Sequence, residues 1–425
     1  MEIHELYALY LKYPSIQTDT RKIKQGDLFF ALKGPNFNGN QFAKVALELN
    51  ASFVILDEPA GFNDDKIIYT NDALETLQKL AKFHRQQFTI PFIAITGSNG
   101  KTTTKELINE VLSTTYKTYT TKGNLNNHIG IPLTILSVRP DAEIAVIEMG
   151  ANHLKEIESY CQYTLPTHGL ITNCGKAHLE GFGGMDGVRK GKGELFDYLK
   201  LHNGIAFIFS DYEYLNEMAK GINTIKTYGT QHADIVGIEN PSNEFLEVSI
   251  AKGTSVKNIK TNLVGAYNLP NVLAAIAIGK YFDVADDKIK TALEQYSPSN
   301  SRSQLIERDG NKIILDAYNA NPTSMKAAIE NLAGIQAVNK ILLLGGMMEM
   351  GEDSISEHQQ LIELIQNHNW KNVVLVGGDF KNIAHPYTYF DTSTQAKEWF
   401  HQQQLKNYII LIKGSRSMQM EKILD

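Results

Sequence analysis

The chain has 425 residues, of which 43% are hydrophobic and 21% charged, and its formal net charge is −6. These values predict a folded protein of roughly three domains, and they exclude a disordered chain and non-specific nucleic-acid binding through a large basic surface. No apolar run is long enough to span a membrane, no secretory signal opens the chain, and the two cysteines, Cys161 and Cys174, cannot form a disulfide framework. We therefore expect a cytoplasmic protein with no membrane insertion and no nucleic-acid partner.

The first predicted domain, residues 1–88, mixes short strands with helices. Apolar residues predict strands at Asp27–Leu32 and Phe53–Leu56. Leucines recur at helical spacing within Asp72–Gln87, which predicts a helix that leads into the next domain. This region is expected to be a small mixed α/β module.

The second predicted domain, residues 89–299, opens with an apolar strand at Ile90–Ile95 and a glycine-rich turn. Further buried-type strands are predicted at Ile144–Ile147 and Leu170–Thr172, and a helix at Gly265–Lys280. Short apolar strands that alternate with helices indicate a parallel sheet covered on both faces. We expect a central domain that resembles P-loop ATPases.

The third predicted domain, residues 300–425, follows a polar stretch at 297–301 that is typical of a linker. Strands and helices alternate along it, which predicts a doubly wound, Rossmann-like α/β domain. The strands are expected at Lys312–Leu315, Ile341–Leu344, Val373–Val376 and Tyr408–Ile412, and the helices near 323–337, 355–368 and 393–403.

The turn after the first central strand reads TGSNGKTT over residues 96–103. Glycines allow backbone N–H groups to approach phosphate oxygens, and the following helix places its positive N-terminal end there. Lys101 can reach terminal phosphates and the Thr102 hydroxyl can bind Mg²⁺. The general P-loop pattern has Gly where this chain has Ile95. The order of strand, turn, lysine, hydroxyl and helix still predicts an ATP site that includes Gly97, Asn99, Gly100, Lys101, Thr102 and Thr103.

Two more polar residues follow predicted strands of the same sheet. Glu148 ends the strand at 144–147, where a carboxylate beside a phosphate loop can hold Mg²⁺. An exposed strand-end glutamate explains this residue equally well. His178 lies in the segment NCGKAHLEGFG, residues 173–183, and either a ligand or a structural role fits a histidine in this position.

Taken together, these segments resemble the Mur ligase family, in which the phosphate loop has the shortened form Gly-x-x-Gly-Lys-Thr. The resemblance implies that Lys101 binds the β- and γ-phosphates of ATP. It also implies two Mg²⁺ ions, one held by Thr102 and Glu148 and a second held by His178. All four residues stand in the matching motifs of this chain.

The resemblance also implies a carbamylated lysine. Lys192, in VRKGKGELF over residues 188–196, matches the lysine that the family carbamylates, with Lys190 as the alternative register. Carbamylation replaces a cation that repels Mg²⁺ with an anionic oxygen, the ligand type that this ion prefers. Lys192 is therefore expected among the metal ligands.

Further nucleotide contacts are implied around the boundary of the second and third domains. The segment GAYNLPN, residues 265–271, resembles a family motif that approaches adenine, although Tyr267 stands where histidine is usual. Arg302 matches an arginine that reaches ATP when the third domain closes. The implied contacts in this part of the chain are Asn268, Asn271, Arg302, Asp316 and Tyr318.

The segment DAYNANP, residues 316–322, resembles the branch of the family that adds D-alanyl-D-alanine. Three further segments agree: 126–134, 344–352 and 413–418, although Gly346 replaces a common acidic residue. The resemblance implies ATP-dependent joining of D-alanyl-D-alanine to the terminal carboxylate of UDP-N-acetylmuramoyl-tripeptide through an acyl phosphate, a step of peptidoglycan synthesis. No general base is identified.

The N-terminal segments TDTR and GDLFFAL, at 18–21 and 26–32, resemble the family's module for the UDP end of the precursor. Asn38-Gly39-Asn40 stands where Asp-Gly-His is usual. The substrate-binding candidates are Thr20, Arg21, Asn126, Asn127, Asn319, Asn321 and Arg416.

Two alternative functions remain open on the sequence. The first is another amino-acid ligase of the superfamily, such as the enzyme that adds the third residue, or a folylpolyglutamate synthase. The second is a nucleotide-gated switch, which needs the phosphate loop but not the set of Glu148, His178 and Lys192. We expect a monomer whose third domain closes over ATP.

Overall fold

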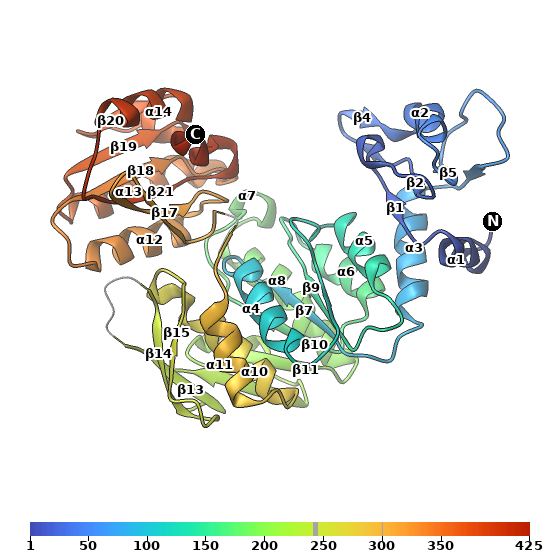
Figure 1. The fold of residues 1–425 in the computed structure, drawn as a ribbon, viewed down its shortest axis with the longest axis horizontal. Helices are drawn as coiled ribbons and strands as arrows, with labels where there is room; N and C mark the ends of the chain where they lie inside the picture. The colour runs from blue at the N-terminus through green and yellow to red at the C-terminus, as the bar shows by residue number, and fades with distance from the viewer. Residues whose placement is uncertain (241–244, 300) are drawn as a thin grey trace.

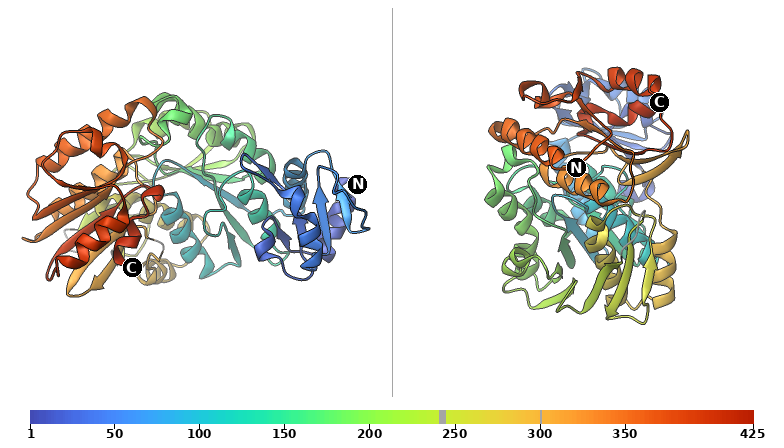
Figure 2. Two further views of the ribbon diagram at one scale, coloured as in Figure 1. Left: turned by 90° about the horizontal axis from the view of Figure 1, so that it is seen from above. Right: turned by 90° about the vertical axis from the view of Figure 1, so that its left-hand side faces the viewer.

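The computed structural model describes residues 1–240, 245–299 and 301–425. Three α/β regions follow one another along the chain, each built around its own sheet. The N-terminal and C-terminal regions lie at the two ends of the longest axis, with the central region between them (Figure 1). Seen from above, the three regions form an arc (Figure 2).

The N-terminal region contains a four-stranded parallel sheet in the order β1-β2-β5-β6. The predicted strands near 27–32 and 53–56 are confirmed as β2 and β5, and the predicted helix as α3. Asp72 caps α3 by accepting a hydrogen bond from the backbone N–H of Glu75 at 2.7 Å. The elements are α1 (Ile3–Lys12), β1 (Ile16–Gln17), β2 (Leu28–Phe30), β3 (Lys33–Gly34), β4 (Phe37–Asn38), α2 (Ala43–Glu48), β5 (Phe53–Leu56), β6 (Ile67–Tyr69) and α3 (Ala73–Arg85).

Helix α3 joins this region to the central one, because its C-terminal end runs down beside α5 and α6 (Figure 1). The guanidinium of Arg85 donates to the carbonyls of Thr164 and Leu165 at the end of α6, at 2.9 and 3.0 Å. Arg139 donates to the Tyr10 hydroxyl at 2.7 Å. Buried contacts of this kind hold the N-terminal region firmly against the central one.

The central region contains a nine-stranded sheet in the order β15-β14-β13-β12-β11-β10-β7-β9-β8. Its strands from β7 to β13 are parallel to their neighbours, as predicted, but β14 and β15 pair antiparallel. The strands are β7 (Phe92–Thr96), β8 (Thr118–Thr120), β9 (Ile144–Glu148), β10 (His168–Ile171), β11 (Ile205–Phe209), β12 (Thr224–Gly229), β13 (Ile235–Asn240), β14 (Glu247–Lys252) and β15 (Asn258–Lys260).

The antiparallel extension was not predicted because its strands are only half-buried and carry many polar residues, so they lack the continuous apolar run of a central strand. On the core strands, α4 and α10 pack against each other. The helices of this region are α4 (Lys101–Ser113), α5 (Gly130–Ser137), α6 (Glu156–Thr164), α7 (Leu179–Phe182), α8 (Met185–Leu201), α9 (Glu213–Met218), α10 (Leu269–Tyr281) and α11 (Asp286–Gln295).

The C-terminal region is a six-stranded sheet in the order β16-β17-β21-β18-β19-β20, parallel except for β16. The four predicted strands are confirmed as β17, β18, β19 and β21, and edge strands β16 and β20 are additional. The predicted linker at 297–301 includes residue 300, which lies outside the described residues. The elements are β16 (Gln304–Arg308), β17 (Asn311–Asp316), α12 (Pro322–Gly334), β18 (Lys340–Gly345), α13 (Ser354–Gln366), β19 (Asn372–Val376), β20 (Thr388–Phe390), α14 (Ser393–Gln402) and β21 (Ile409–Lys413).

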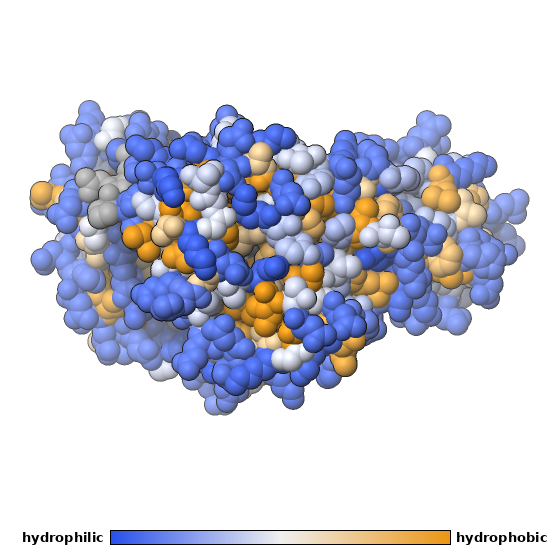
Figure 3. Space-filling view, turned by 90° about the horizontal axis from the view of Figure 1, so that it is seen from below, coloured by the Kyte–Doolittle hydropathy of each residue, from blue (hydrophilic) through white to orange (hydrophobic). Residues whose placement is uncertain are grey.

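The surface is largely hydrophilic on the face seen from below, where apolar residues form separate patches (Figure 3). Among the described residues, no helix combines the length and apolar character needed to cross a bilayer.

Candidate active site

The loop between β7 and α4 has the backbone that a phosphate site requires. Gly97 and Gly100 have positive φ angles of 144° and 80°, which favour glycine. A Cβ on Gly97 would lie 2.0 Å from Thr172 Oγ1, and one on Gly100 would lie 2.7 Å from Asn271 Oδ1. Helix α4 begins at Lys101, so its N-terminal N–H groups point into this loop.

Glu148 ends β9 beside the start of α4, and its buried carboxylate collects several donors. The Thr102 hydroxyl lies 3.0 and 2.9 Å from its two oxygens. Asn126 Nδ2 donates to Oε1 at 2.8 Å, and the Glu148 backbone N–H donates to Thr121 Oγ1 at 3.0 Å. A hydroxyl and a carboxylate side by side at a phosphate loop form a donor set that suits Mg²⁺, which takes few protein ligands and completes its shell with phosphate and water.

Cations surround this carboxylate. Lys101 folds over the loop and donates to the carbonyl oxygens of Gly97 and Ser98, at 2.6 and 3.3 Å. Burial lowers the pKa of Lys101, while the charge of Glu148 opposes that shift and the charge of Arg302 adds to it. The excess of positive charge makes the site suitable for a polyphosphate.

Lys192 lies on α8 and is fully buried, whereas its neighbour Lys190 is exposed. The Lys192 ammonium donates to the carbonyl of Ala151 at 2.8 Å and lies 4.9 Å from the centre of the Phe182 ring. Burial, with a smaller contribution from the charge of Lys101, lowers the pKa of Lys192 to about 7. A large fraction of this amine is therefore unprotonated near neutral pH and can act as a nucleophile.

The C-terminal region docks on the loop after β10, residues 173–178. Asn321 Nδ2 donates to Asn99 Oδ1 at 2.7 Å, which ties the start of α12 to the phosphate loop. The Lys176 ammonium lies 2.5 Å from Glu357 Oε1 on α13, and the side chain of Glu357 is only 8% exposed. His178 contacts the carboxylate of Glu349, and both residues have positive φ angles.

These contacts yield a first prediction about docking. We expect Lys176→Met to shift the protein towards arrangements in which the C-terminal region is undocked, because it leaves a buried carboxylate without its cation. Small-angle scattering without ligands should then give a larger radius of gyration than the wild type. Lys326→Met, which removes an exposed pair with Glu330 on α12, is the matched control. Superimposable profiles for all three proteins would contradict the prediction.

The remaining predicted nucleotide residues of the C-terminal region lie close to its junction with the central region. The Arg302 guanidinium stacks on the Tyr318 ring at 3.6 Å. Asp316 pairs with buried Lys413 at 2.6 Å and accepts from the Ser303 backbone N–H at 3.2 Å. The Lys413 ammonium also donates to the carbonyl of Asn319 at 3.2 Å. Lys413 thus holds the end of β17 and the start of the 316–322 segment in place.

Two of the departures from the family pattern, Tyr267 and Gly346, have structural accounts. The Tyr267 hydroxyl lies 2.8 Å from Ser303 Oγ, so this side chain contacts the start of the C-terminal region. A Cβ on Gly346 would lie 2.5 Å from the Cα of Gly378, so the close approach of two backbones excludes an acidic side chain here.

Asn268 and Asn271, also predicted at the nucleotide, lie at the start of α10 behind the phosphate loop. Asn271 donates to Asn268 Oδ1 and accepts from Thr104, both at 2.9 Å. Asn268 donates to the carbonyl of Val264 at 2.9 Å. Both side chains are buried. Thr103 follows Thr102 in the first turn of α4 and is half-buried.

Several predicted substrate residues lie away from this cluster. Thr20 and Arg21 belong to a short 3₁₀ helix of the N-terminal region, where Arg21 pairs with Asp19 at 2.9 Å. Asn127 accepts the backbone N–H of Gly130 at 2.9 Å at the start of α5. Arg416 pairs with Glu421 at 2.6 Å.

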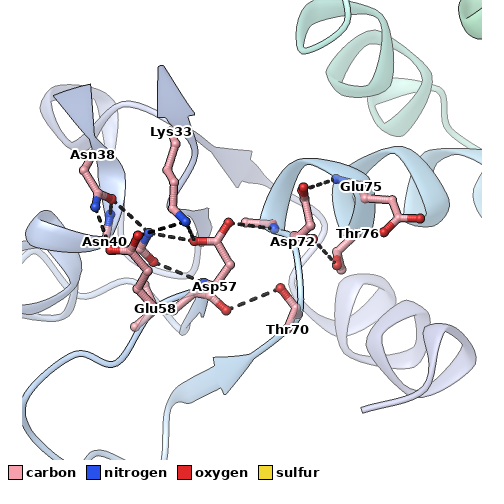
Figure 4. A network of polar contacts seen from close by, with 11 residues as sticks. Lys33, Asn38, Asn40, Asp57, Glu58, Thr70, Asp72, Glu75 and Thr76 are labelled. Atoms are coloured by element: carbon pink, nitrogen blue, oxygen red, sulfur yellow. Dashed lines mark hydrogen bonds and ion pairs between the residues drawn. The ribbon is translucent and has the colours of Figure 1, made fainter. Parts of the chain in front are cut away.

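The amides that replace the usual Asp-Gly-His residues belong to a separate polar network (Figure 4). Asn38 donates to Glu58 at 2.6 Å, and Asn40 donates to Asp57 at 2.8 Å. The Lys33 ammonium lies 3.0 Å from Asp57 and 2.9 Å from Glu58. The network ties the β3–β4 hairpin to the end of β5, which gives both asparagines a structural role.

The structure adds residues that sequence reasoning missed. Lys105 is buried on α4, and Glu349 and Lys413 contact predicted site residues. A signal existed for Lys105, which stands four residues after Lys101 and therefore on the same helical face. No sequence signal links Glu349 to His178.

The predicted metal residues are only partly assembled. Thr102 and Glu148 are in contact, but His178 faces Glu349 and Lys192 faces Ala151. Within the described part of the chain, no group of three or more His, Cys, Asp or Glu side chains is arranged to hold a metal ion. The arrangement can bind a polyphosphate at the α4 N-terminus and can bring groups of a second region to it.

Comparison with known proteins gives consistent results. Family models match residues 12–91 (Mur ligase family, catalytic domain), 95–279 (Mur ligase middle domain) and 301–416 (Mur ligase, glutamate ligase domain). The UDP-N-acetylmuramoyl-tripeptide–D-alanyl-D-alanine ligase of Bacillus subtilis is 35% identical, over 96% of this chain and 92% of its own. The Escherichia coli enzyme of the same name is 33% identical, over 99% and 95%.

Solved structures agree with these relatives. The crystal structure of MurF from Acinetobacter baumannii aligns with a TM-score of 0.88 at 30% identity, over 96% of this chain and 92% of its own. The MurF ligase from Thermotoga maritima, solved in complex with ADP, aligns with a TM-score of 0.85 at 26% identity, over 97% of each chain. Both the sequence match over nearly the whole chain and the shared three-region architecture lead to one conclusion: this protein belongs to the Mur ligase family of ATP-dependent amide-bond-forming ligases.

Proposed function

We propose that this protein joins D-alanyl-D-alanine to the terminal carboxylate of UDP-N-acetylmuramoyl-tripeptide, with conversion of ATP to ADP and phosphate. One observation supports the proposed reaction most directly. The Thr102–Glu148 pair lies at the phosphate loop, and the C-terminal region contacts the same loop through Asn321. The choice of substrates is supported by relatives of that name that match nearly the whole chain.

The reaction has two steps. A carboxylate oxygen of the tripeptide attacks the γ-phosphorus of ATP, so that an O–P bond forms, the bond to ADP breaks, and an acyl phosphate results. The amine of D-alanyl-D-alanine then attacks the acyl carbon, loses a proton, and expels phosphate as the amide forms. Both steps require positioning and neutralisation of charge. Lys101 and Arg302 are placed to neutralise phosphate charge near the loop.

In this proposal Thr102 and Glu148 would hold Mg²⁺, which would neutralise charge on the transferring phosphoryl group. His178 and a carbamylated Lys192 would hold a second ion. The buried position and lowered pKa of Lys192 support carbamylation, because CO₂ reacts with the unprotonated amine. The Glu349 contact to His178 accords with the way metal-binding histidines orient one ring nitrogen on a carboxylate.

The three regions divide the work along the proposed boundaries. Residues 1–88 bind the UDP end of the precursor, with Thr20 and Arg21 as contacts. Residues 89–299 bind ATP through Gly97, Asn99, Gly100, Thr103, Asn268 and Asn271. Residues 300–425 close over ATP with Asp316 and Tyr318. The same region binds the dipeptide through Asn319, Asn321 and Arg416. Asn126 and Asn127 of the central region face the tripeptide. The protein acts as a monomer in the cytoplasm.

Phosphate release from Mg·ATP tests the proposed function. We expect release only when both UDP-N-acetylmuramoyl-tripeptide and D-alanyl-D-alanine are present, with a product heavier by the mass of the dipeptide less water. Release supported by a single amino acid in place of the dipeptide would assign the protein to another branch of ligases. Release that needs no amine would indicate a nucleotide-driven switch.

A further inference from the structure

The nucleotide site contains a further buried lysine, Lys105, that has no part in the reaction described above. Lys105 lies on α4 one turn after Lys101 and is only 3% exposed. Its ammonium donates to the backbone carbonyl of Thr121 at 2.7 Å and lies 3.9 Å from the half-buried carboxylate of its neighbour Glu106. Burying an ammonium costs free energy, which a lysine at the protein surface avoids.

Thr121 connects Lys105 to the carboxylate at the end of β9. It follows the edge strand β8, and its side chain is completely buried. Its carbonyl accepts from Lys105, while its hydroxyl accepts from the backbone N–H of Glu148 at 3.0 Å. One residue thus links the ammonium on α4 to the backbone of Glu148.

The loop that begins at Thr121 returns to the same carboxylate. Asn126 donates to Glu148 Oε1 at 2.8 Å, and its carbonyl accepts the backbone N–H of Gly150 at 2.8 Å. A Cβ on Gly150 would lie 3.0 Å from Asn126, so this loop packs directly on the strand end. Glu148 is therefore held by Thr102 of α4 on one side and by the 121–126 loop on the other.

Lys105 also interacts with Glu148 through its charge, in addition to the hydrogen bond that it donates to Thr121. Burial lowers the pKa of Lys105, while the negative charge of Glu148 opposes that shift. Arg302 of the C-terminal region also interacts electrostatically with this ammonium. An ammonium in this position adds to the positive field that favours a polyphosphate.

We propose that Lys105 is a positioning residue of the nucleotide site. Through its hydrogen bond to Thr121, Lys105 holds Glu148 and the 121–126 loop in the arrangement that binds Mg²⁺ with the nucleotide. This inference rests on the proposed use of Mg·ATP, and it assigns to Lys105 and Thr121 a role distinct from phosphate contact.

Calorimetric binding of ADP, with and without Mg²⁺, tests the inference in the full-length protein. We expect Lys105→Met to weaken Mg·ADP binding by about tenfold or more and to raise the KM for ATP, while the KM for D-alanyl-D-alanine stays within about twofold. Thr121→Val keeps the shape of the side chain but removes the acceptor for Glu148 N–H, and should act in the same direction by about three- to tenfold. Lys122→Met, at an exposed position next to Thr121, is the control and should bind as the wild type does.

The outcomes separate positioning from packing. If both variants bind Mg·ADP like the wild type, even with lower melting temperatures, Lys105 serves only the fold and the inference is wrong. If Lys105→Met does not fold, Thr121→Val decides alone. If the wild type binds Mg·ADP but forms no amide product, the proposed function fails, while weakened binding by the variants still supports the inference.

Discussion

Lys192→Met is expected to lower kcat by about 100-fold or more, which corresponds to about 2.7 kcal/mol of transition-state stabilisation. Methionine fills the same buried space on α8 but cannot react with CO₂ or provide an oxygen ligand. Steady-state phosphate release with both substrates measures the effect. Lys190→Met is the matched control, because Lys190 lies two residues away and is exposed. Equal losses in the two variants would contradict a special role for Lys192.

The pH dependence of the CO₂ requirement provides a second test of the same residue. Burial lowers the pKa of Lys192 to about 7, so the unprotonated amine predominates above that pH and becomes scarce below it. This form reacts with CO₂ and releases a proton as the carbamate forms, so a higher pH favours the carbamate. Wild-type protein depleted of CO₂ should therefore regain activity at a lower concentration of dissolved CO₂ at pH 8 than at pH 6. Lys192→Met should show no bicarbonate response at either pH.

Glu148→Gln is expected to reduce kcat/KM by about 100- to 1,000-fold, equivalent to about 3–4 kcal/mol. The amide keeps the shape and one acceptor oxygen for Thr102 and Asn126, but it removes the negative charge that attracts Mg²⁺. The activity should therefore need a higher Mg²⁺ concentration, which a titration of Mg²⁺ at saturating ATP measures.

A suitable control for this variant is Glu143→Gln. Glu143 precedes β9 at the other end of the strand, where it accepts the backbone N–H of Lys117 at the surface. We expect it to leave the Mg²⁺ dependence unchanged. If Glu148→Gln retains both the wild-type activity and the wild-type Mg²⁺ dependence, Glu148 is a structural strand-end residue.

Four strands of the C-terminal region and β7, β9 and β10 of the central sheet could be predicted because they are apolar runs. Strand β11 is also an apolar run but was not predicted. Strands β7, β9 and β10 are buried on every residue, and each ends at a polar residue or segment that was predicted to belong to the site. Strands β14 and β15 escaped prediction because a half-buried antiparallel edge alternates apolar and polar residues over short stretches.

Local patterns in the sequence were enough to predict the family, the three-part order of the chain, and the presence of a phosphate loop and a strand-end carboxylate in one sheet. These features depend on local spacing in the sequence. The glycines of the phosphate loop, Lys101 and Thr102 lie within six consecutive residues, 97–102, and Glu148 is the last residue of a buried strand.

The contacts between side chains of different regions became known from the folded structure. Lys176 meets Glu357 and Asn99 meets Asn321, although these partners are separated by 181 and 222 positions, and no local pattern encodes such contacts. The structure likewise distinguished buried Lys192 from exposed Lys190, which sequence spacing could not do. It also showed that buried Lys105 donates to Thr121, the residue whose hydroxyl accepts the backbone N–H of Glu148. The physical reason is the same in each case: burial and charge interactions arise when distant segments pack together, so they become visible only once the chain is folded.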